Sequence, residues 1–314
     1  MIVNTESENP FNREFYLSVF LRFILFMIVG LIVGEMASYL VYRYYFGEDF
    51  LSVISKAILH PEENLGLGMS LLLGQAAYSL IWFLVFPLLF ISKTQFPIHY
   101  NSWNNNPQVA VSSFSNMFVI MFFVLPLSSV LVEWNQMIVL PDFLSGFEQW
   151  ARDSEKEIAA LTRVITHFST LPNFLVGILI IGVLAAVGEE LTFRGVLQPL
   201  FIHLFRNKHL GVLITAFIFG AIHMQFFSFL PRFVLGVLFG YIYVYSQNLW
   251  VPIFGHFVNN SLSLFFVYRY GMDKADVPID VLDQSSWVLF LFSGSVIGIV
   301  FFFLKRLWAN NIGS

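Results

Sequence analysis

The residues of this sequence best suited to chemistry are two adjacent carboxylates, Glu189 and Glu190, followed by Arg194. They come directly after an almost continuous run of Leu, Ile, Val, Ala and Gly over residues 173–187. A helix through this run would carry three ionisable groups to membrane depth, where each costs about 3 kcal/mol on insertion scales. Such residues indicate a functional site unless they are paired for purely structural reasons.

Three further polar residues stand in apolar surroundings. His223 ends the segment FGAIH, while His256 and Asn260 lie in FGHFVNN. His256 and Asn260 are one helical turn apart, so they can present two hydrogen-bond donors to one point, as a developing oxyanion requires. Because every buried polar residue carries its own insertion cost, their joint presence favours one shared site.

Helical geometry separates the roles of the two carboxylates. Glu190 and Arg194 are four residues apart with the acid first, which is the favourable order for an ion pair. Glu189 points about 100 degrees away from that face and has no local partner. An unpaired carboxylate in apolar surroundings is a candidate general base, so we expect Glu189 to do chemistry and the pair to support it.

Composition indicates an integral membrane protein. Of 314 residues, 57% are hydrophobic and 11% are charged, whereas soluble domains have about 25% charged residues. The absence of cysteine excludes disulfides and thiolate catalysis. The net charge of -4 comes with no basic run that would suggest nucleic acid. The expected surroundings are therefore a lipid bilayer.

The expected fold is all-α: a polytopic membrane helix bundle forming one integral membrane domain over residues 1–314, with about eight transmembrane helices. Charged and apolar residues alternate over residues 142–167 as in an amphipathic helix at the membrane interface. That helix either only connects its neighbours or gates substrate. The apolar runs are 17–42, 67–91, 110–132, 174–187, 209–224, 233–245, 252–267 and 287–304.

Topology and packing can also be predicted. An even number of spans places both termini on one side of the membrane, and we expect cytoplasmic termini in a bacterial cytoplasmic membrane, although Lys and Arg are nearly balanced between the two sides. Three glycine pairs with GxxxG spacing predict close helix contacts. They begin at Gly30, Gly236 and Gly294.

The polar residues form three ordered motifs, EExxxR from Glu189, FxxxH ending at His223, and HxxxN from His256 to Asn260. From Glu190 to His223 and from His223 to His256 the distance is 33 residues each. This set resembles the CPBP family of intramembrane endopeptidases, which includes CAAX prenyl proteases of the Rce1 type and bacterial Abi or bacteriocin-processing proteins.

The resemblance implies a helical, protease-like core over about residues 170–270. It also implies that Glu189 activates the hydrolytic water with His223, and that His256 and Asn260 stabilise the tetrahedral oxyanion. Glu190 and Arg194 would then be supporting residues, in agreement with the helical-face argument. The substrate would be a membrane-associated peptide or protein.

Zinc is the alternative to direct water activation. Glu189, Glu190, His223 and His256 are ligand types that zinc accepts, and the family has been regarded as metalloproteases. Against zinc, the candidate ligands come from three helices and include no HExxH pair. We therefore expect no cofactor.

Two alternatives from other functional classes remain. Buried Glu, Arg, His and Asn also line ion or proton pathways in transporters, where a carboxylate titrates between two access states. Transporters commonly show internal repeats, and none is detectable in this sequence. A non-catalytic membrane scaffold or immunity protein is the other alternative, although it would not need an intact set of motifs.

Overall fold

The computed structural model describes residues 13–94, 107–271 and 284–311, and in these ranges it contains helices and no strands. Helices are the expected solution for an apolar chain, because in lipid each backbone N–H and C=O must be paired within its own segment. The principal helices are α1 (Arg13–Phe46), α2 (Phe50–Leu59), α3 (Gly68–Ser79), α4 (Phe86–Lys93), α5 (Pro107–Gln136), α6 (Ser145–Ile165), α7 (Leu171–Gly177), α8 (Ala185–Glu190), α9 (Gln198–Phe205), α10 (Lys208–Ala221), α11 (Phe229–Ser246), α12 (Trp250–Tyr270) and α14 (Gln284–Asn311).

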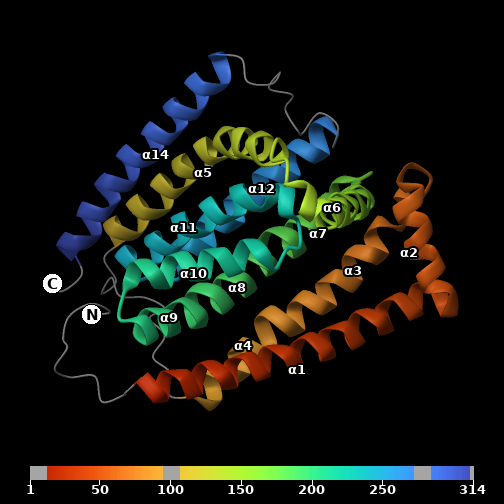
Figure 1. Cartoon of the computed structure of the whole chain (residues 1–314), viewed down its shortest axis with the longest axis horizontal. Coiled ribbons are helices and arrows are strands. Elements are labelled where there is room, and N and C mark those ends of the chain that lie inside the picture. Colours follow the sequence, from red (N-terminus) through yellow and green to blue (C-terminus); the bar gives the residue numbers. More distant parts are fainter. Residues whose placement is uncertain (1–12, 95–106, 272–283, 312–314) are drawn as a thin grey trace.

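The long helices form three groups, as Figure 1 shows. α1 packs along α3 and α4 on one side, and α5 packs against α14 on the other. Between them lie α8 to α12, where α10 packs on both α9 and α11, and α12 packs on α5 and α8. The helices that carry the motif residues therefore occupy the middle of the bundle.

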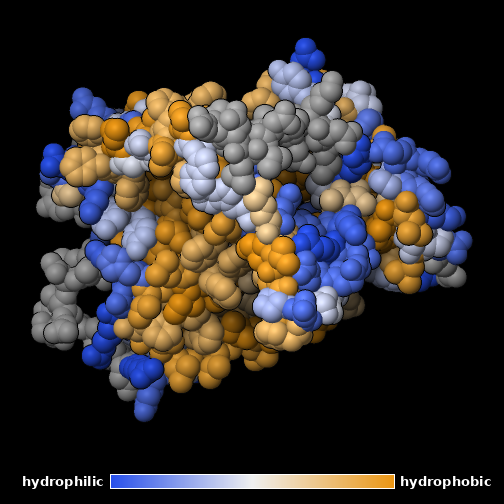
Figure 2. Space-filling view, turned by 45° about the horizontal axis from the view of Figure 1, so that its top comes forward, coloured by the Kyte–Doolittle hydropathy of each residue, from blue (hydrophilic) through white to orange (hydrophobic). Residues whose placement is uncertain are grey.

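Within the described residues, six helical segments are long and apolar enough to cross a membrane, fewer than the eight spans expected. Each expected run is helical, but α10 has only 14 residues, and α12 is less apolar because it carries His256, Asn259 and Asn260. Figure 2 shows a broad hydrophobic surface between more hydrophilic ends, as a bundle in lipid requires. The chain is thus a polytopic helical membrane protein.

The first and last helices that the structure describes are α1 and α14. The beginning of α1 and the end of α14 lie at the same end of the bundle (Figure 1). Residues 1–12 and 312–314, on which the prediction about the termini falls, lie outside the described residues.

The segment with the EExxxR motif is helical without a break from Leu171 to Phe205, and two stretches of it are π-helical. These are η6 (Ile178–Leu184) and η7 (Leu191–Leu197), which flank α8 on both sides. A π-helical turn inserts an extra residue and rotates the side chains that follow it, and such turns are frequent at functional sites. The ideal 3.6-residue period of an α-helix could not predict these π-helical stretches.

The amphipathic helix expected at residues 142–167 is present as α6 (Ser145–Ile165). It lies beside α2 at one end of the bundle (Figure 1). Its apolar side chains Phe147 and Trp150 are 41% and 48% exposed, which suits a helix lying at a lipid interface. Arg163 near its end forms an ion pair with Glu62, joining α6 to the connection before α3.

Two of the three GxxxG pairs make the close contacts predicted for them. A Cβ added at Gly30 would meet the Phe86 ring at 2.7 Å, and one added at Gly236 would meet the Ala216 Cβ at 3.0 Å. The third pair, Gly294 and Gly298 on α14, has no neighbour within 4 Å of such a Cβ among the described residues. For that pair the prediction of a contact within the chain was wrong.

Candidate active site

Glu190 and Arg194 form an ion pair with no exposed surface. Arg194 Nη1 donates to Glu190 Oε1 at 2.7 Å, and both side chains are 0% exposed. α8 ends at Glu190 and η7 begins directly after it, so the pair spans the junction of two helix types. Charges buried to this degree need a partner and further hydrogen bonds to compensate for their lost solvation. The ion pair expected from the four-residue spacing is present.

Arg194 is held from a second helix as well. Its Nη2 donates to the carbonyl of Gly236 on α11 at 3.0 Å, and its guanidinium carbon lies 4.9 Å from the centre of the Phe219 ring. One turn further along both helices, Gln198 Nε2 donates to the carbonyl of Gly240 at 3.0 Å. This ladder of two side chains on two glycine carbonyls fixes the motif helix against α11.

His256 joins the two carboxylates. Its Nδ1 is 2.9 Å from Glu190 Oε1, and its Nε2 is 3.8 Å from Glu189 Oε2. A carboxylate paired with arginine accepts hydrogen bonds, so Nδ1 carries a hydrogen and donates it to Glu190. The ring is stacked on Phe239 at a centroid distance of 5.5 Å. His256 therefore has one nitrogen committed to the buried pair and one nitrogen directed at Glu189.

Glu189 differs from its neighbour in exposure and in partners. Its side chain is 16% exposed, and its ion-pair contact among the described residues is the 3.8 Å approach of His256 Nε2. That distance is too long for a hydrogen bond, so both carboxylate oxygens can accept one from another molecule. A carboxylate that is partly open and lightly held can take a proton from water, which the sealed Glu190 cannot do.

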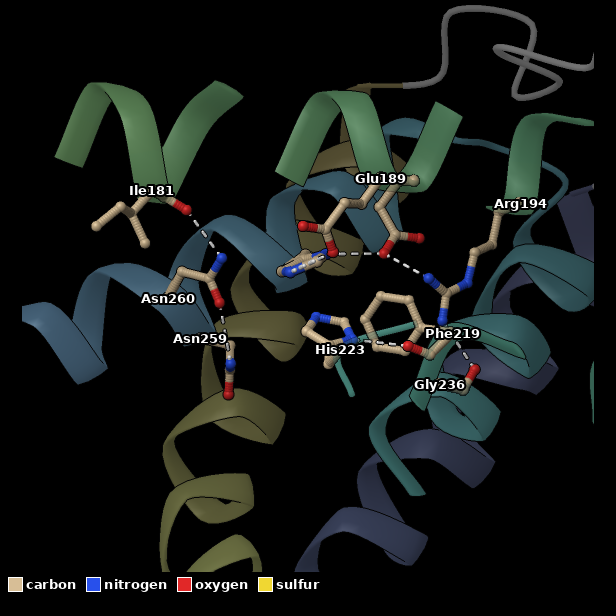
Figure 3. A network of polar contacts seen from close by, with 10 residues as sticks. Ile181, Glu189, Arg194, Phe219, His223, Gly236, Asn259 and Asn260 are labelled. Atoms are coloured by element: carbon tan, nitrogen blue, oxygen red, sulfur yellow. Dashed lines mark hydrogen bonds and ion pairs between the residues drawn. The ribbon is translucent and has the colours of Figure 1, made fainter. Parts of the chain in front are cut away.

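His223 lies just after the end of α10 and faces the same region. Its Nδ1 is 2.8 Å from the carbonyl oxygen of Phe219. A carbonyl only accepts, so Nδ1 must carry the hydrogen, which leaves Nε2 for water or substrate. Burial lowers the pKa of the His223 imidazole, and the negative charge of Glu189 acts against this lowering. Figure 3 shows Glu189 and His223 projecting toward the space between their helices.

Asn260 is held apart from His256. Its Nδ2 donates to the carbonyl of Ile181 at 2.9 Å, and its Oδ1 accepts from Asn259 at 3.3 Å (Figure 3). Of the two adjacent asparagines, Asn260 is therefore the one that contacts the motif helix. The structure gives Asn260 and His256 different partners, and one amide hydrogen of Asn260 stays available for another acceptor.

An apolar hollow lies among the helices that surround the site. It has a volume of about 340 Å³ and is lined by aliphatic and aromatic side chains of α5, η6, α8 and α12, among them Val187 and Ile253. Val187 and Ile253 belong to the same helices as Glu189 and His256, but no motif residue lines the hollow.

Part of the candidate zinc ligand set is already engaged by protein partners. Glu190 Oε1 accepts from Arg194 and His256, and Nδ1 of each histidine is bonded elsewhere. Among the described residues, no group of three carboxylate or imidazole side chains converges to hold an ion.

Several residues of this site were not predicted as such. The carbonyl groups of Phe219, Gly236 and Ile181 hold His223, Arg194 and Asn260, respectively. Carbonyl groups leave no trace in residue type, so these partners could not be read from the sequence. One signal was present: Arg194 and Gln198 are four residues apart, as are Gly236 and Gly240, so a ladder between two helices was possible.

Comparison with known proteins identifies the segment around this site. Residues 171–262 match the family described as type II CAAX prenyl endopeptidase Rce1-like. "Uncharacterized protein YpbD" of Bacillus subtilis is 33% identical over 89 residues, which is 27% of this chain and 42% of that protein. "Uncharacterized 24.3 kDa protein" of Escherichia coli is 30% identical over 105 residues, which is 31% of this chain and 46% of that protein.

The chain thus spans less than half the length of these two curated relatives. No solved structure matches it. All seven motif residues, from Glu189 to Asn260, fall within the matched range. The segment that builds the polar site is therefore the one that matches the Rce1-like endopeptidase family, which its three motifs also resemble.

Proposed function

We propose that this protein is an intramembrane endopeptidase, a hydrolase that cleaves a peptide bond in a membrane-associated peptide or protein. One observation carries the proposal: of two adjacent carboxylates, Glu190 is sealed by Arg194 and His256, while Glu189 is partly open beside two imidazoles. An enzyme that activates water needs this combination, with one group free to move a proton and a rigid support behind it.

In the proposed reaction, Glu189 takes a proton from a water molecule and His223 Nε2 helps to orient that water. The water oxygen bonds to the carbonyl carbon of the substrate, and the carbonyl oxygen becomes an oxyanion. His256 and Asn260 stabilise this charge, His256 through Nε2 if it is protonated there and Asn260 through its second amide hydrogen. The bond from carbon to nitrogen then breaks, and the proton held by Glu189 passes to the leaving amine.

The support for metal-free chemistry is the donor arrangement itself. Glu190 Oε1 and the Nδ1 atoms of His223 and His256 are bound to protein partners, and the candidate ligands come from three separate parts of the chain. We expect cleavage to persist when the purified protein is dialysed against a strong zinc chelator. Loss of cleavage on chelation, with recovery on adding zinc alone, would replace this proposal by the zinc-dependent one.

The substrate class follows from where the site lies. The site is built from helices in the middle of a membrane bundle, and two of these helices, α8 and α12, also line an apolar hollow through side chains such as Val187 and Ile253. A substrate that reaches it must itself be membrane-associated. Both curated relatives are bacterial proteins, which supports a bacterial cytoplasmic membrane as the location.

The deciding experiment compares the protein termini of membranes from cells that contain either the native chain or Glu189→Gln. This exchange preserves the shape of the side chain but removes the basic group, so a new terminus produced by the enzyme should disappear. Glu157→Gln, on the exposed face of α6, is the matched control and should leave all termini unchanged. Identical termini in native and Glu189→Gln cells would contradict the proposal.

A further inference from the structure

The turn that carries His223 is held by a carboxylate of the interfacial helix. Glu155 on α6 accepts a hydrogen bond from the backbone N–H of Phe227 at 3.0 Å through Oε2, and one from the Ser228 hydroxyl through Oε1. Phe227 and Ser228 belong to η8 (Phe226–Ser228), four and five residues after His223. Both oxygens of one carboxylate are thus committed to a segment more than seventy residues away.

Two neighbouring contacts also hold this turn. Arg152, one turn before Glu155 on α6, places its guanidinium carbon 4.0 Å from the centre of the Phe227 ring. Asn135 at the end of α5 donates to the carbonyl of Phe226 at 3.0 Å. The turn between α10 and α11 is therefore fixed from two other helices, and α6 contributes the charged group.

The other acidic residues of α6 whose hydrogen bonds the structure describes bind residues of α6 itself or directly before it. Glu148 accepts from Arg152 on the same helix and from the backbone of Leu140 just before it. Asp153 accepts from Gln149 and Lys156, both within α6. Such contacts stabilise a surface helix, whereas those of Glu155 fasten the helix to the site.

The turn needs such a fastening. Met224, directly after His223, has a φ of 55°. A non-glycine residue holds this left-handed conformation only where surrounding contacts maintain it, and such strain is common at functional sites. If the far end of a short turn is released, a residue near its start can relax and turn the neighbouring imidazole away.

We infer that Glu155 is a positioning residue for His223. By holding residues 227 and 228, it keeps the turn in the conformation that presents the His223 ring to Glu189. The connecting helix α6 is thereby part of the site, although it contributes no reacting group. This inference rests on the proposed function, because it assigns Glu155 a role in the same hydrolysis.

The test measures how fast the Glu189-dependent terminus accumulates in cells after induction of each variant. Glu155→Ala removes both acceptors and should lower the rate about 10- to 100-fold, since displacing a positioned group costs this much. Glu155→Gln can accept from Phe227 N–H and donate to the Ser228 oxygen, so it should stay within about threefold of native, a small loss for one neutral hydrogen bond. Glu157→Ala is the matched control, because Glu157 is exposed on the same helix.

A double-mutant cycle separates positioning from general damage. In a His223→Ala background, Glu155→Ala should reduce the remaining rate less than about threefold, because the group it positions is already gone. Hydrogen exchange of purified protein in detergent should show faster exchange of residues 222–228 in Glu155→Ala and unchanged exchange in α12.

Two outcomes overturn the inference: a native rate in Glu155→Ala, or a reduction of the same size with and without His223. If Glu155→Ala does not fold, a Glu155→Gln variant that folds but loses activity as completely as Glu189→Gln overturns it as well. The inference and the proposed function fail separately, because an inactive Glu189→Gln beside a fully active Glu155→Ala refutes the inference alone.

Discussion

Two glutamate–arginine pairs in this chain have the same sequence spacing and the same distance between nitrogen and oxygen, but one is buried and the other is at the surface. Glu190 and Arg194 approach to 2.7 Å with both side chains 0% exposed. Glu148 and Arg152 also approach to 2.7 Å, but on the surface helix α6, with side chains 20% and 37% exposed. Four-residue spacing on a helix explains why both pairs form. It does not explain what each pair does for the protein.

Burial makes the difference because it forces the pair to recruit other helices. The buried pair takes a carbonyl from Gly236 on α11 and an imidazole from His256 on α12. The exposed pair is partly solvated by water, and its further partners are the backbone just before α6 and the Phe227 ring, none of them charged. The same local motif is therefore a junction of three helices in one place and a surface contact in the other.

Removing one member of each pair should show the largest contrast. Arg194→Ala leaves a buried carboxylate without its counter-charge and should lower the free energy of unfolding by about 3–5 kcal/mol. Arg152→Ala, the matched change on the surface, should lower it by no more than about 1 kcal/mol. Unfolding of the purified proteins in detergent measures both values, and equal losses would show that burial does not distinguish the pairs.

Substitutions of the two adjacent carboxylates should affect different properties, one the cleavage rate and the other the stability. Glu189→Gln should lower the rate of peptide cleavage about 10²- to 10⁴-fold through loss of the general base, with native stability. Glu190→Gln should lower the free energy of unfolding by about 1–3 kcal/mol, since hydrogen-bonded partners of a buried charge lose their acceptor. Cleavage and unfolding are measured on the same samples. Loss of stability in Glu189→Gln would argue that Glu189 is structural too.

Adding a methyl group at Gly236, whose carbonyl binds Arg194, should lower the stability of the protein moderately. A Cβ at Gly236 would lie 3.0 Å from the Ala216 Cβ and would push α11 away from α10. Gly236→Ala should therefore destabilise the protein by about 1–3 kcal/mol, as overpacking does in other cores. Gly294→Ala has open space around it and serves as the control in the same unfolding assay. A larger loss from Gly294→Ala would contradict this assignment.

The smallest effect is expected at the exposed pair, and it depends on pH. The hydrogen bond from Arg152 holds the pKa of the Glu148 carboxyl below its usual 4.5. A depressed pKa in the folded state means that the pair stabilises the fold above about pH 4.5, and that this contribution is lost as pH falls through the lowered pKa. The unfolding difference between native protein and Glu148→Ala should be small at pH 7 and vanish in acid. A difference in unfolding free energy that grows as the pH falls would contradict this prediction.

Much of the fold was predictable, because apolar runs in a membrane protein have few structural solutions. The bundle, the interfacial helix and the ion pair at Glu190 all follow from composition and helical spacing. The number of long apolar helices did not, since α12 spends part of its length on polar site residues and α10 ends after 14 residues. The π-helical stretches around α8 were also hidden, because no residue type marks them.

The sequence by itself determined which residues meet within one helix, since a spacing of four residues brings side chains together whatever surrounds them. It therefore determined the bond between Glu190 and Arg194 and left Glu189 without a partner. Only the tertiary structure decided that His256 bonds to Glu190, that Asn260 is held by Ile181, and that Glu155 holds the turn of His223. These contacts depend on how whole helices pack, and packing follows no local period in the chain.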